Sequence, residues 1–435
     1  MKQKLAIIGS GIAGLGAAYH LKDYYDVTVI EQNKTVGGHA HTISIKEGDK
    51  LVPIDTAFMV FNKNMYPNLY NLFSELNIPI KKTEVSFGIQ QKRTEREYLT
   101  SSINGMLAQR GNIFNIDHLN LMLQIIKLNK NCGSDLDSNK FANYSLKQYV
   151  NEKGFSYSLL ENFLVPVCSG IWSLPPHKAN EFPFEFLVRF LKNCGILGDH
   201  GNNDWYTVEN GSQTYIKVLT QIIEKNIQTN RKVVYVKRQK DLDRGGVVLY
   251  FEDGTYEKYH KVVFACNAEQ VLRILEDDAT NLEYSLLRNF KVETNTVKLH
   301  TDESVMPKNK RAWGGWNYRV EMGRTTAIYW LNRLQQINAS QNYFISINDT
   351  GLVAEDKVLK TIDREQPVFD LKAIKAQEYL PKLNQVPENE GMEKTTYFCG
   401  SYFKYGFHED AYTSAINCSN ALIGQMKYSQ VEIYK

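Results

Sequence analysis

The sequence predicts a mixed α/β fold in which a domain with a parallel sheet is interleaved with a second domain. A short buried strand, a glycine-rich turn and a helical pattern begin near residue 5, and a second strand–loop–helix pattern lies near residue 400. The 435 residues also exceed what one compact domain usually holds. Two or three folding units are therefore expected.

The first of these patterns has the spacing of a nucleotide-binding unit. Residues Leu5 to Gly9 form the strand, Gly9-Ser-Gly11-Ile-Ala-Gly14 forms the turn, and helical periodicity continues to Leu21. The first glycine permits the turn, the second admits a pyrophosphate to the backbone, and the third lets the helix pack close to the sheet. The free N–H groups of the helix N-terminus then face the phosphates. The predicted contacts are Gly9, Gly11, Ile12, Ala13 and Gly14.

An acidic residue ends the next predicted strand. Val27 to Ile30 is β-rich, and Glu31 follows it, 20 residues after Gly11. A carboxylate in this place accepts hydrogen bonds from both ribose hydroxyls of a dinucleotide. Strand, turn, helix, strand and acid together predict a Rossmann-type domain with Glu31 and Gln32 in its site. The unit by itself fits FAD and NAD equally.

The residues that follow resemble one group of flavoproteins. Gly37-Gly-His-Ala-His-Thr42 comes six positions after Glu31, and Ile54-Asp-Thr-Ala-Phe58 comes next. The sequence is similar here to the large group that contains amine oxidases, protoporphyrinogen oxidase and phytoene desaturases. The resemblance implies FAD as cofactor, with the doublet's backbone lying against it. The implied contacts are Gly37, Gly38, His39, Thr56, Ala57 and Phe58.

The sequence departs from the group's pattern at two of these positions. His39 stands where an arginine usually follows the doublet, and Ala57 stands where glycine is common. The arginine-to-histidine change affects the side chain that would reach the flavin phosphates. His39 and His41 are two residues apart, but no third ligand accompanies them, so no metal site is predicted.

The pattern near residue 400 resembles the second FAD motif of the same group. Thr395 to Gly400 is strand-like, a loop begins at Ser401, and a helix is expected from Ala411 to about Met426. The resemblance implies that this unit holds the ribityl chain and phosphate, and that its helix N-terminus stabilises the negative charge of reduced flavin. Ser401 stands where an acidic residue is common. The implied contacts are Gly400, Ser401, Phe407, His408, Glu409 and Asp410.

The middle of the chain supplies the remaining architecture. Three β-rich runs lie between Lys232 and Ala265, with a hairpin turn predicted at Asp253-Gly254. The resemblance implies that this region forms a β-meander and that Val262 to Ala265 rejoins the sheet. Val234 resembles the group's adenine contact. Helices are expected over Met65 to Leu76 and Phe141 to Val150. The predicted fold is thus flavin amine oxidase-like. Its FAD-binding domain comprises residues 1–85, 205–288 and 388–435, and its substrate-binding domain comprises 86–204 and 289–387.

Composition excludes several other classes of protein. With 51 basic and 48 acidic residues the net charge is only +3, which is unlike a nucleic-acid-binding protein. The basic stretch Pro307 to Arg311 is expected to be a solvated loop. The six cysteines form no C-x-x-C pair, which indicates reduced thiols and a cytoplasmic protein. No signal peptide or bilayer-spanning segment is predicted, and peripheral attachment to a membrane stays open.

A narrower resemblance concerns the substrate. The segments Asp55 to Asn62, Trp316-Asn-Tyr318, Tyr329 to Gln335 and Tyr405 to Asp410 are similar to bacterial predicted NAD/FAD-binding oxidoreductases associated with cyclopropane-fatty-acyl synthases. This resemblance implies lipid metabolism. The hypothesis it favours is an FAD-dependent oxidoreductase that desaturates, saturates or oxidises an apolar acyl chain. The alternatives are an amine oxidase or double-bond isomerase, and a non-catalytic partner of a lipid-modifying methyltransferase.

Both FAD motifs are expected to converge on the flavin, where hydride moves between substrate carbon and flavin N5. The candidates for moving a proton there are His39, His408 and Glu409. Tyr66, Arg333 and Tyr405 are weaker candidates for contacts with flavin or substrate. A group of aromatic residues is expected either in the core or along a substrate cavity, namely Trp313, Trp316, Tyr318, Tyr329 and Trp330.

Overall fold

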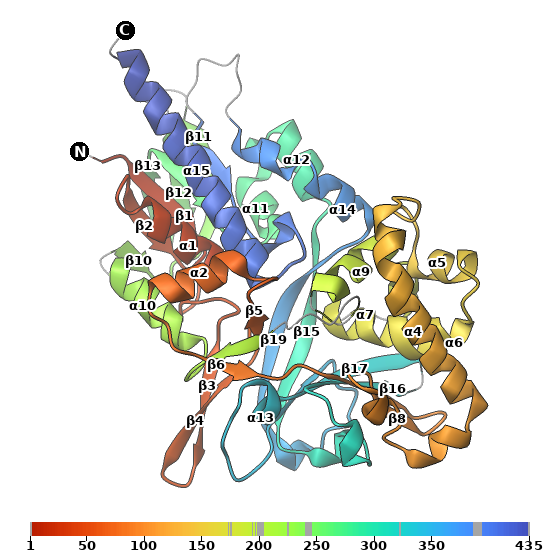
Figure 1. Ribbon diagram of the computed structural model, residues 1–435. Coiled ribbons are helices and arrows are strands. Elements are labelled where there is room, and N and C mark those ends of the chain that lie inside the picture. The colour runs from red at the N-terminus through yellow and green to blue at the C-terminus, as the bar shows by residue number, and fades with distance from the viewer. Residues whose placement is uncertain are drawn as a thin grey trace.

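The computed structural model describes residues 2–172, 174, 176–193, 195, 197, 204–223, 226–239, 246–321, 323–385 and 394–433. Strands from the two ends of the sequence lie in one lobe, together with the long helix α15 (His408–Ile433). The second lobe combines a large sheet with a group of helices from the middle of the chain (Figure 1). The chain therefore crosses between the lobes several times.

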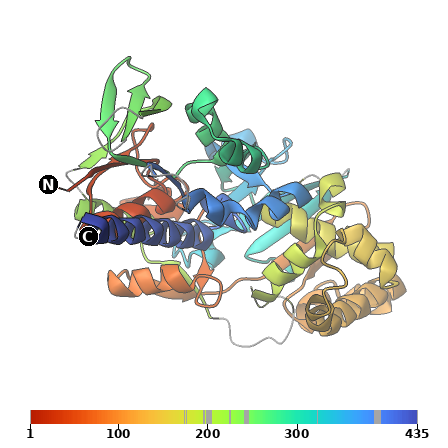
Figure 2. The ribbon, with the colours of Figure 1, turned by 90° about the horizontal axis from the view of Figure 1, so that it is seen from above.

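The first lobe is built on a five-stranded parallel sheet. Its order is β10 (Ile227–Gln228), β2 (Asp26–Ile30), β1 (Lys4–Ile8), β14 (Lys261–Phe264) and β20 (Thr396–Phe398). β1, β14 and β20 are buried almost throughout, as is usual when both faces of a parallel sheet are covered, whereas β10 at the edge is only partly buried. Helices α1 (Ile12–Leu21) and α15 lie side by side on one face (Figures 1 and 2). The predicted Rossmann-type opening is confirmed as strand, turn, helix and parallel strand.

A β-meander and four helices complete this lobe. The meander consists of β11 (Val233–Gln239), β12 (Gly246–Phe251) and β13 (Tyr256–Tyr259), and its second turn is at Asp253-Gly254, as expected. The helices are α2 (Pro67–Glu75), α10 (Gln213–Ile223), α11 (Ala268–Leu275) and α12 (Asn281–Leu287).

The second lobe contains a seven-stranded mixed sheet. Its order is β19 (Val358–Val368), β15 (Lys291–His300), β18 (Phe344–Ile347), β17 (Arg324–Trp330), β16 (Trp316–Glu321), β7 (Phe87–Gln91) and β8 (Arg96–Leu99). Neighbouring strands are antiparallel except β16 and β7, which are parallel. The aromatic segments near residues 316 and 329 therefore pair with each other in the middle of a sheet.

Helices pack beside this sheet. They are α3 (Ile103–Met106), α4 (Ile116–Asp137), α5 (Leu146–Glu152), α6 (Tyr157–Leu159), a π-helical turn (Leu160–Leu164), α7 (Val165–Trp172), α8 (Pro176–Asn180) and α9 (Phe184–Asn193). The helix expected from Phe141 begins only at Leu146. Ser145 accepts a hydrogen bond from Gln148 N, and the Gln148 side chain accepts one from Ser145 N, so this capping box sets the start.

Two smaller sheets connect the lobes. One is the hairpin β3 (Thr42–Glu47) and β4 (Lys50–Asp55), and the other has the order β5 (Phe61–Asn62), β9 (Trp205–Val208) and β6 (Ile80–Thr83). α13 (Leu331–Leu334) follows β17 and precedes Gln335. The Gln335 side chain accepts a hydrogen bond from Asp55 N and donates one to Asp55 O. Asp55 also accepts hydrogen bonds from Thr42 Oγ1 and Ser212 Oγ, both at 2.6 Å, while burial raises its pKa to about 6.

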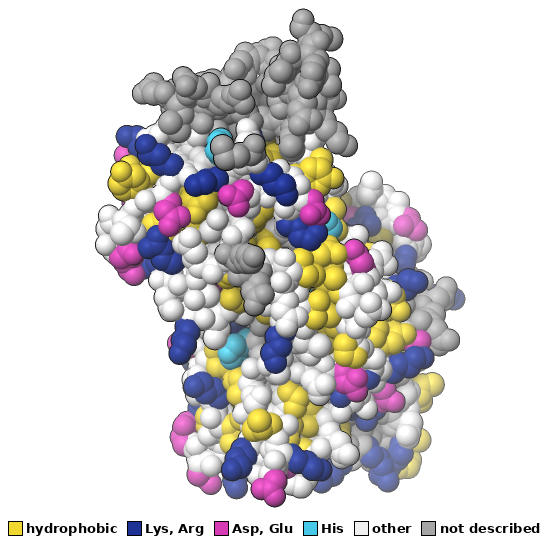
Figure 3. All heavy atoms as spheres, turned by 90° about the vertical axis from the view of Figure 1, so that its left-hand side faces the viewer, with side chains coloured by type: hydrophobic (Ala, Val, Ile, Leu, Met, Phe, Trp, Pro, Cys, Tyr) yellow, Lys and Arg dark blue, Asp and Glu magenta, His cyan; other side chains and the backbone are white. Residues whose placement is uncertain are grey.

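The outer surface carries both signs of charge. On the face seen in Figure 3, Lys and Arg side chains alternate with Asp and Glu, and apolar side chains gather toward the middle. Within the described ranges, no helix is both long and apolar enough to cross a membrane. α14 (Leu371–Gln377) and a 3₁₀ helix (Leu380–Asn384) precede β20, and α15 begins at His408, three residues earlier than expected.

Candidate cofactor site and active site

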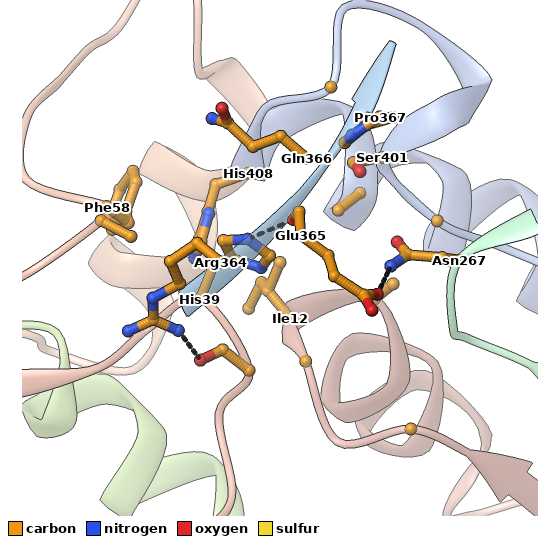
Figure 4. A pocket seen from close by; sticks show the side chains of 18 of the residues that line it. Ile12, His39, Phe58, Asn267, Arg364, Glu365, Gln366, Pro367, Ser401 and His408 are labelled. Atoms are coloured by element: carbon orange, nitrogen blue, oxygen red, sulfur yellow. Dashed lines mark hydrogen bonds between the residues drawn. The ribbon is translucent and has the colours of Figure 1, made fainter. Parts of the chain in front are cut away.

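A large cavity lies between the two lobes at the carboxyl ends of β1, β2 and β14. Its volume is about 820 Å³, and β15 and β19 of the second lobe form its opposite wall. Ligands of open parallel sheets bind in this position, and the volume is at the upper end of the roughly 300–1,000 Å³ usual for small-molecule sites. Figure 4 shows the side chains from both lobes that meet there.

The three glycines of the first turn fulfil the separate roles expected of them. A Cβ on Gly9 would lie 2.7 Å from Ala265 O, and one on Gly14 would lie 1.9 Å from Gly9 O, so packing of the turn excludes side chains there. Gly11 has no heavy atom within 4 Å of its Cβ position, which faces the cavity. Gly11 is also the N-cap of α1, with no side chain capping the helix. The turn therefore leaves a cradle in which backbone N–H groups can bind a diphosphate.

The glycine doublet packs directly on this cradle. Gly37 forms a β-bridge with Gly11, and a Cβ on Gly38 would lie 3.1 Å from Gly11 Cα. Both glycines have positive φ, +119° and +59°, a conformation that favours glycine. Gly38 lines the cavity, whereas Gly37 and Gly14 do not and instead pack beneath the residues that line it.

Glu31 is held rigidly at the nucleotide end of the cavity. Its Oε2 accepts hydrogen bonds from Ser10 N and Ser10 Oγ, at 3.0 and 2.6 Å. Its Oε1 accepts from Asn33 N and Asn33 Nδ2, at 2.8 and 2.9 Å. Ser10 and Asn33 are thus positioning residues that the sequence motif does not identify. Gln32 and Val234 line the same end, next to Arg231 and Lys232.

His408 lies at the other end, where the second motif meets the first. Its ring stacks on Phe58 with 4.1 Å between centroids, and its Nε2 lies 3.1 Å from Tyr215 Oη. Burial and, secondarily, the neighbouring His39 lower the pKa of His408 to about 3. The imidazole is therefore neutral at physiological pH.

His39 lines the cavity and bonds to the opposite wall. Its Nε2 donates to Glu365 O on β19 at 3.1 Å (Figure 4). Burial and the nearby Arg364 guanidinium lower the pKa of His39 to about 4. The residue directly after the glycine doublet is thus a neutral histidine.

Arg364 brings a positive charge to the same place. Its Nη2 donates to Thr56 Oγ1 at 3.0 Å, and its Nη1 donates to Gly38 O at 3.3 Å. Its Nε is buried and has no hydrogen-bond partner among the described residues. Arg364 could not be identified from the sequence, because it lies on β19, 326 residues from Gly38. The neighbouring Glu365 carboxylate accepts a hydrogen bond from Asn267 Nδ2 at 3.0 Å.

The structure does not bring Glu409 to the cavity. Its Oε1 accepts from Asn68 N, Asn68 Nδ2 and Thr413 Oγ1, and its Oε2 accepts from Leu69 N, all within 2.9–3.1 Å. The carboxylate therefore caps α2, and its geometry contradicts the proton-transfer role expected from the sequence. Asp410 also points away from the cavity: its Oδ2 accepts from Phe407 N at 2.9 Å, and burial raises its pKa to about 7.

The remaining candidates divide between the cavity and the rest of the protein. Tyr66 lines the cavity. Arg333 forms an ion pair with Glu84, and Tyr405 packs on Phe186 at 4.6 Å, so neither reaches the site. Most of the predicted cofactor contacts line the cavity, namely Gly9, Gly11, Ile12, Ala13, Glu31, Gln32, Gly38, His39, Thr56, Ala57, Phe58, Val234, Gly400, Ser401, Phe407 and His408.

The cavity has a distinct apolar end. Its side chains come from α7, α9, β9, β16, β17 and the segment before α2, namely Met59, Val60, Met65, Tyr66, Ile171, Phe190, Trp205, Trp316, Tyr318 and Tyr329. Tyr318 and Tyr329 both contact Gly170 of α7, since Tyr329 Oη donates to Gly170 O at 3.3 Å and a Cβ on Gly170 would overlap the Tyr318 ring. Trp313 and Trp330 pack on each other elsewhere.

Comparison with known proteins agrees with this architecture. Residues 12–340 match the family described as flavin containing amine oxidoreductase. No curated protein sequence matches the chain. Among solved structures, putrescine oxidase has a TM-score of 0.68 at 13% identity, with 98% of this chain and 99% of that chain covered.

Two further solved structures are similar. Cyclohexylamine oxidase from Brevibacterium oxydans IH-35A has a TM-score of 0.66 at 12% identity, over 97% of this chain and 100% of that chain. The CLA-producing fatty acid isomerase from P. acnes has a TM-score of 0.61 at 14% identity, over 95% and 97%. The cradle, the doublet and the family match together show that the chain belongs to the flavin containing amine oxidoreductase family and is an FAD-dependent oxidoreductase.

Proposed function

We propose that this enzyme acts on an apolar substrate, a fatty-acyl or other lipid chain, which it desaturates, saturates or oxidises. The observation that carries the proposal is the apolar end of the cavity. None of its ten lining side chains is a carboxylate, so an ammonium group would find no ionic partner there. A hydrocarbon chain, in contrast, gains from burial against Met, Ile, Phe and Trp side chains.

Three carboxylates among the described residues also line the cavity. The Glu31 carboxylate accepts hydrogen bonds from Ser10 and Asn33, and the Glu365 carboxylate accepts one from Asn267. Asp363, on β19, accepts a hydrogen bond from Thr296 Oγ1 at 3.0 Å. Each of the three carboxylates therefore has a neutral partner of its own, and none of them belongs to the ten side chains of the apolar end.

When bound, FAD supplies the hydride acceptor or donor. The protein's own side chains orient the substrate and exclude water. Phe58 and the neutral His408 form a flat wall, and Trp316, Tyr318 and Tyr329 form the aromatic side of the apolar end. His39 and His408 are uncharged. The positive charge beside the glycine doublet therefore comes from Arg364 and from the N-terminus of α15.

A lipid chain is also supported by a structural relative. The fatty acid isomerase shares the fold, and a fatty acid is the substrate class that its name gives. A double-bond isomerase of this chain would use the same apolar cavity with no net change in the flavin. We further propose a cytoplasmic location, since the five cysteines in the described part of the chain are free thiols.

The test uses the flavin absorbance of the holoenzyme under anaerobic conditions. If the enzyme desaturates or oxidises the chain, we expect phospholipid with unsaturated acyl chains to bleach the oxidised flavin. If it saturates the chain, the same lipid should instead restore the absorbance of flavin that has first been reduced chemically. Putrescine and cyclohexylamine should do neither. Ile171→Asp places a carboxylate in the apolar end and should abolish bleaching by lipid, whereas Leu282→Asp, on the outside of α12, should not. Movement of a lipid double bond without bleaching would assign isomerisation, and bleaching by amines alone would overturn the proposal.

A further inference from the structure

An apolar surface projects from the second lobe, remote from the cavity. It consists of side chains of α3, the 3₁₀ turn Arg110–Phe114 and the first half of α4, namely Ile103, Ile113, Phe114, Ile116, Leu123 and Ile126. Each is more than half exposed, from 51% for Ile113 and Ile126 to 91% for Phe114. None of them lines the cavity. Single exposed apolar residues need no explanation, but six within 24 residues of sequence mark an interaction surface.

The first half of α4 is apolar on two faces. Leu121, Ile125 and Leu128 are buried against the rest of the lobe. Ile116, Leu123 and Ile126 lie on the solvent side. A helix at the surface of a globular protein normally has a polar outer face, and a helix that is apolar all round normally has a second apolar environment.

A basic segment borders this surface. Lys308, Lys310 and Arg311 are exposed, and they belong to the stretch that the sequence alone assigned to a solvated loop. The buried Glu97 carboxylate accepts hydrogen bonds from Lys308 N and Asn309 N, both at 2.8 Å. Asn309 Nδ2 also donates to Ala108 O at 2.6 Å, between α3 and the 3₁₀ turn. The segment is therefore fixed next to the apolar surface.

Both signs of charge border the surface, and cations are in excess. Arg110 is exposed and adds to the three cations of the basic segment. Acids are present as well. Asp117 lies 3.7 Å from Arg96, and Glu303 lies 3.8 Å from Lys310. Glu95 is exposed, and its backbone oxygen accepts a hydrogen bond from Gln109, next to Arg110. Apolar side chains bordered by Lys and Arg form the pattern by which proteins bind the headgroup region of anionic bilayers.

We propose that this surface binds the face of an anionic lipid bilayer. Phe114, Ile116 and Leu123 enter the acyl boundary, and Lys308, Lys310 and Arg311 bind the lipid phosphates. α4 lies at the outer edge of the second lobe, on the opposite side from the five-stranded sheet (Figure 1), so the FAD-binding lobe would face away from the membrane. The inference goes beyond the proposed substrate and does not depend on it.

The test is co-sedimentation of the holoenzyme with vesicles. The vesicles are phosphatidylcholine alone or phosphatidylcholine mixed with phosphatidylglycerol. We expect binding to the mixed vesicles, and a roughly hundredfold weaker partition for Phe114→Ser with Ile116→Ser, because each buried apolar side chain is worth about tenfold. Leu51→Ser with Tyr256→Ser is the matched control, since both residues are more than 60% exposed elsewhere, and it should bind like wild type.

Neutralisation of the cations tests the electrostatic part. Lys308→Gln with Lys310→Gln and Arg311→Gln should weaken binding to the anionic vesicles by about fivefold per charge and leave phosphatidylcholine unaffected. Flavin absorbance and Tm confirm that each variant is folded. Wild-type protein that stays in the supernatant, or equal sedimentation of the serine variant, would overturn the proposal. So would a dimer in analytical ultracentrifugation that the serine variant abolishes, since the surface would then join two copies.

Discussion

Arg364 on β19 donates a 3.0 Å hydrogen bond to Thr56 Oγ1, which lies at the opposite wall of the cofactor cavity. The same guanidinium donates to Gly38 O, in the doublet that packs on the phosphate cradle. The two lobes are thereby connected across the cavity by a cation that is next to the neutral His39.

The first prediction is that Arg364 contributes to FAD affinity. Arg364→Gln should weaken binding of FAD to the apoprotein by about tenfold to a hundredfold, because hydrogen bonds to charged groups contribute about 1.5–3 kcal/mol. Fluorescence titration measures it. Lys360→Gln is the control, since it removes the same charge from an exposed position on the same strand. Riboflavin has no diphosphate. A loss of affinity for FAD but not for riboflavin would therefore indicate a contact to the phosphates, and an equal loss for both would indicate a contact to the ring. Unchanged affinity for both ligands would contradict the prediction.

Two glycine substitutions should have different effects. Gly11→Ala places its methyl group in open space at the cavity, and the φ of −65° suits any residue. We expect an unchanged apoprotein Tm and FAD affinity lowered by about tenfold or more, through steric exclusion of the phosphates.

Gly14→Ala, in contrast, should lower the apoprotein Tm itself, since the new Cβ would lie 1.9 Å from Gly9 O. Thermal denaturation followed by FAD titration distinguishes the two variants. A Tm loss in Gly11→Ala as large as that in Gly14→Ala would contradict the separate roles of these glycines.

Glu409→Gln should be a stability variant. The two carboxylate oxygens of Glu409 accept four hydrogen bonds. Glutamine has only one acceptor oxygen, so it can retain only some of them. We expect a loss of about 1–3 kcal/mol in the free energy of unfolding. The pH profile of kcat/KM should keep its shape, and a profile that loses one of its limbs would instead return Glu409 to the catalytic residues.

His408 should make the apoprotein less stable in acid. Its pKa is about 3 in the folded protein, against the ordinary histidine value of 6.5 that applies in the unfolded chain, so the unfolded chain binds the proton first. The stability that the neutral ring contributes is complete above pH 6.5 and is lost as the pH falls toward 3.

His408→Phe retains a ring for stacking on Phe58 and should reduce this pH dependence. Asp55 and Asp410 have raised pKa values, about 6 and 7, and contribute the opposite slope. The useful quantity is therefore the difference in urea midpoint between wild type and variant at about pH 7 and about pH 4.5. Equal pH dependence in the two proteins would show that His408 titrates normally.

The parts of the site that were predictable are those that a short segment determines by itself. Gly9, Gly11 and Gly38 have conformational roles that are encoded by spacing, and the structure places them at the cavity. Glu409 was assigned wrongly because its direction depends on α2, whose N-terminus needs an acceptor. Arg364 was missed because only the sheet order brings β19 to the doublet. Arg333 and Tyr405 carry suitable chemistry, but their partners Glu84 and Phe186 lie elsewhere.

Gly170 sets the width of the apolar end of the cavity. Since Tyr318 occupies the space of a missing methyl group, α7 and the aromatic strand share one surface with no gap between them. Any larger residue at position 170 would displace the tyrosine ring into the cavity and narrow it. For the acyl chain that we propose as substrate, the accepted thickness would thus be determined at a helix position without a side chain of its own. A smaller residue in place of Tyr318 would admit a bulkier substrate, and a larger residue in place of Gly170 would restrict the cavity to a slimmer one.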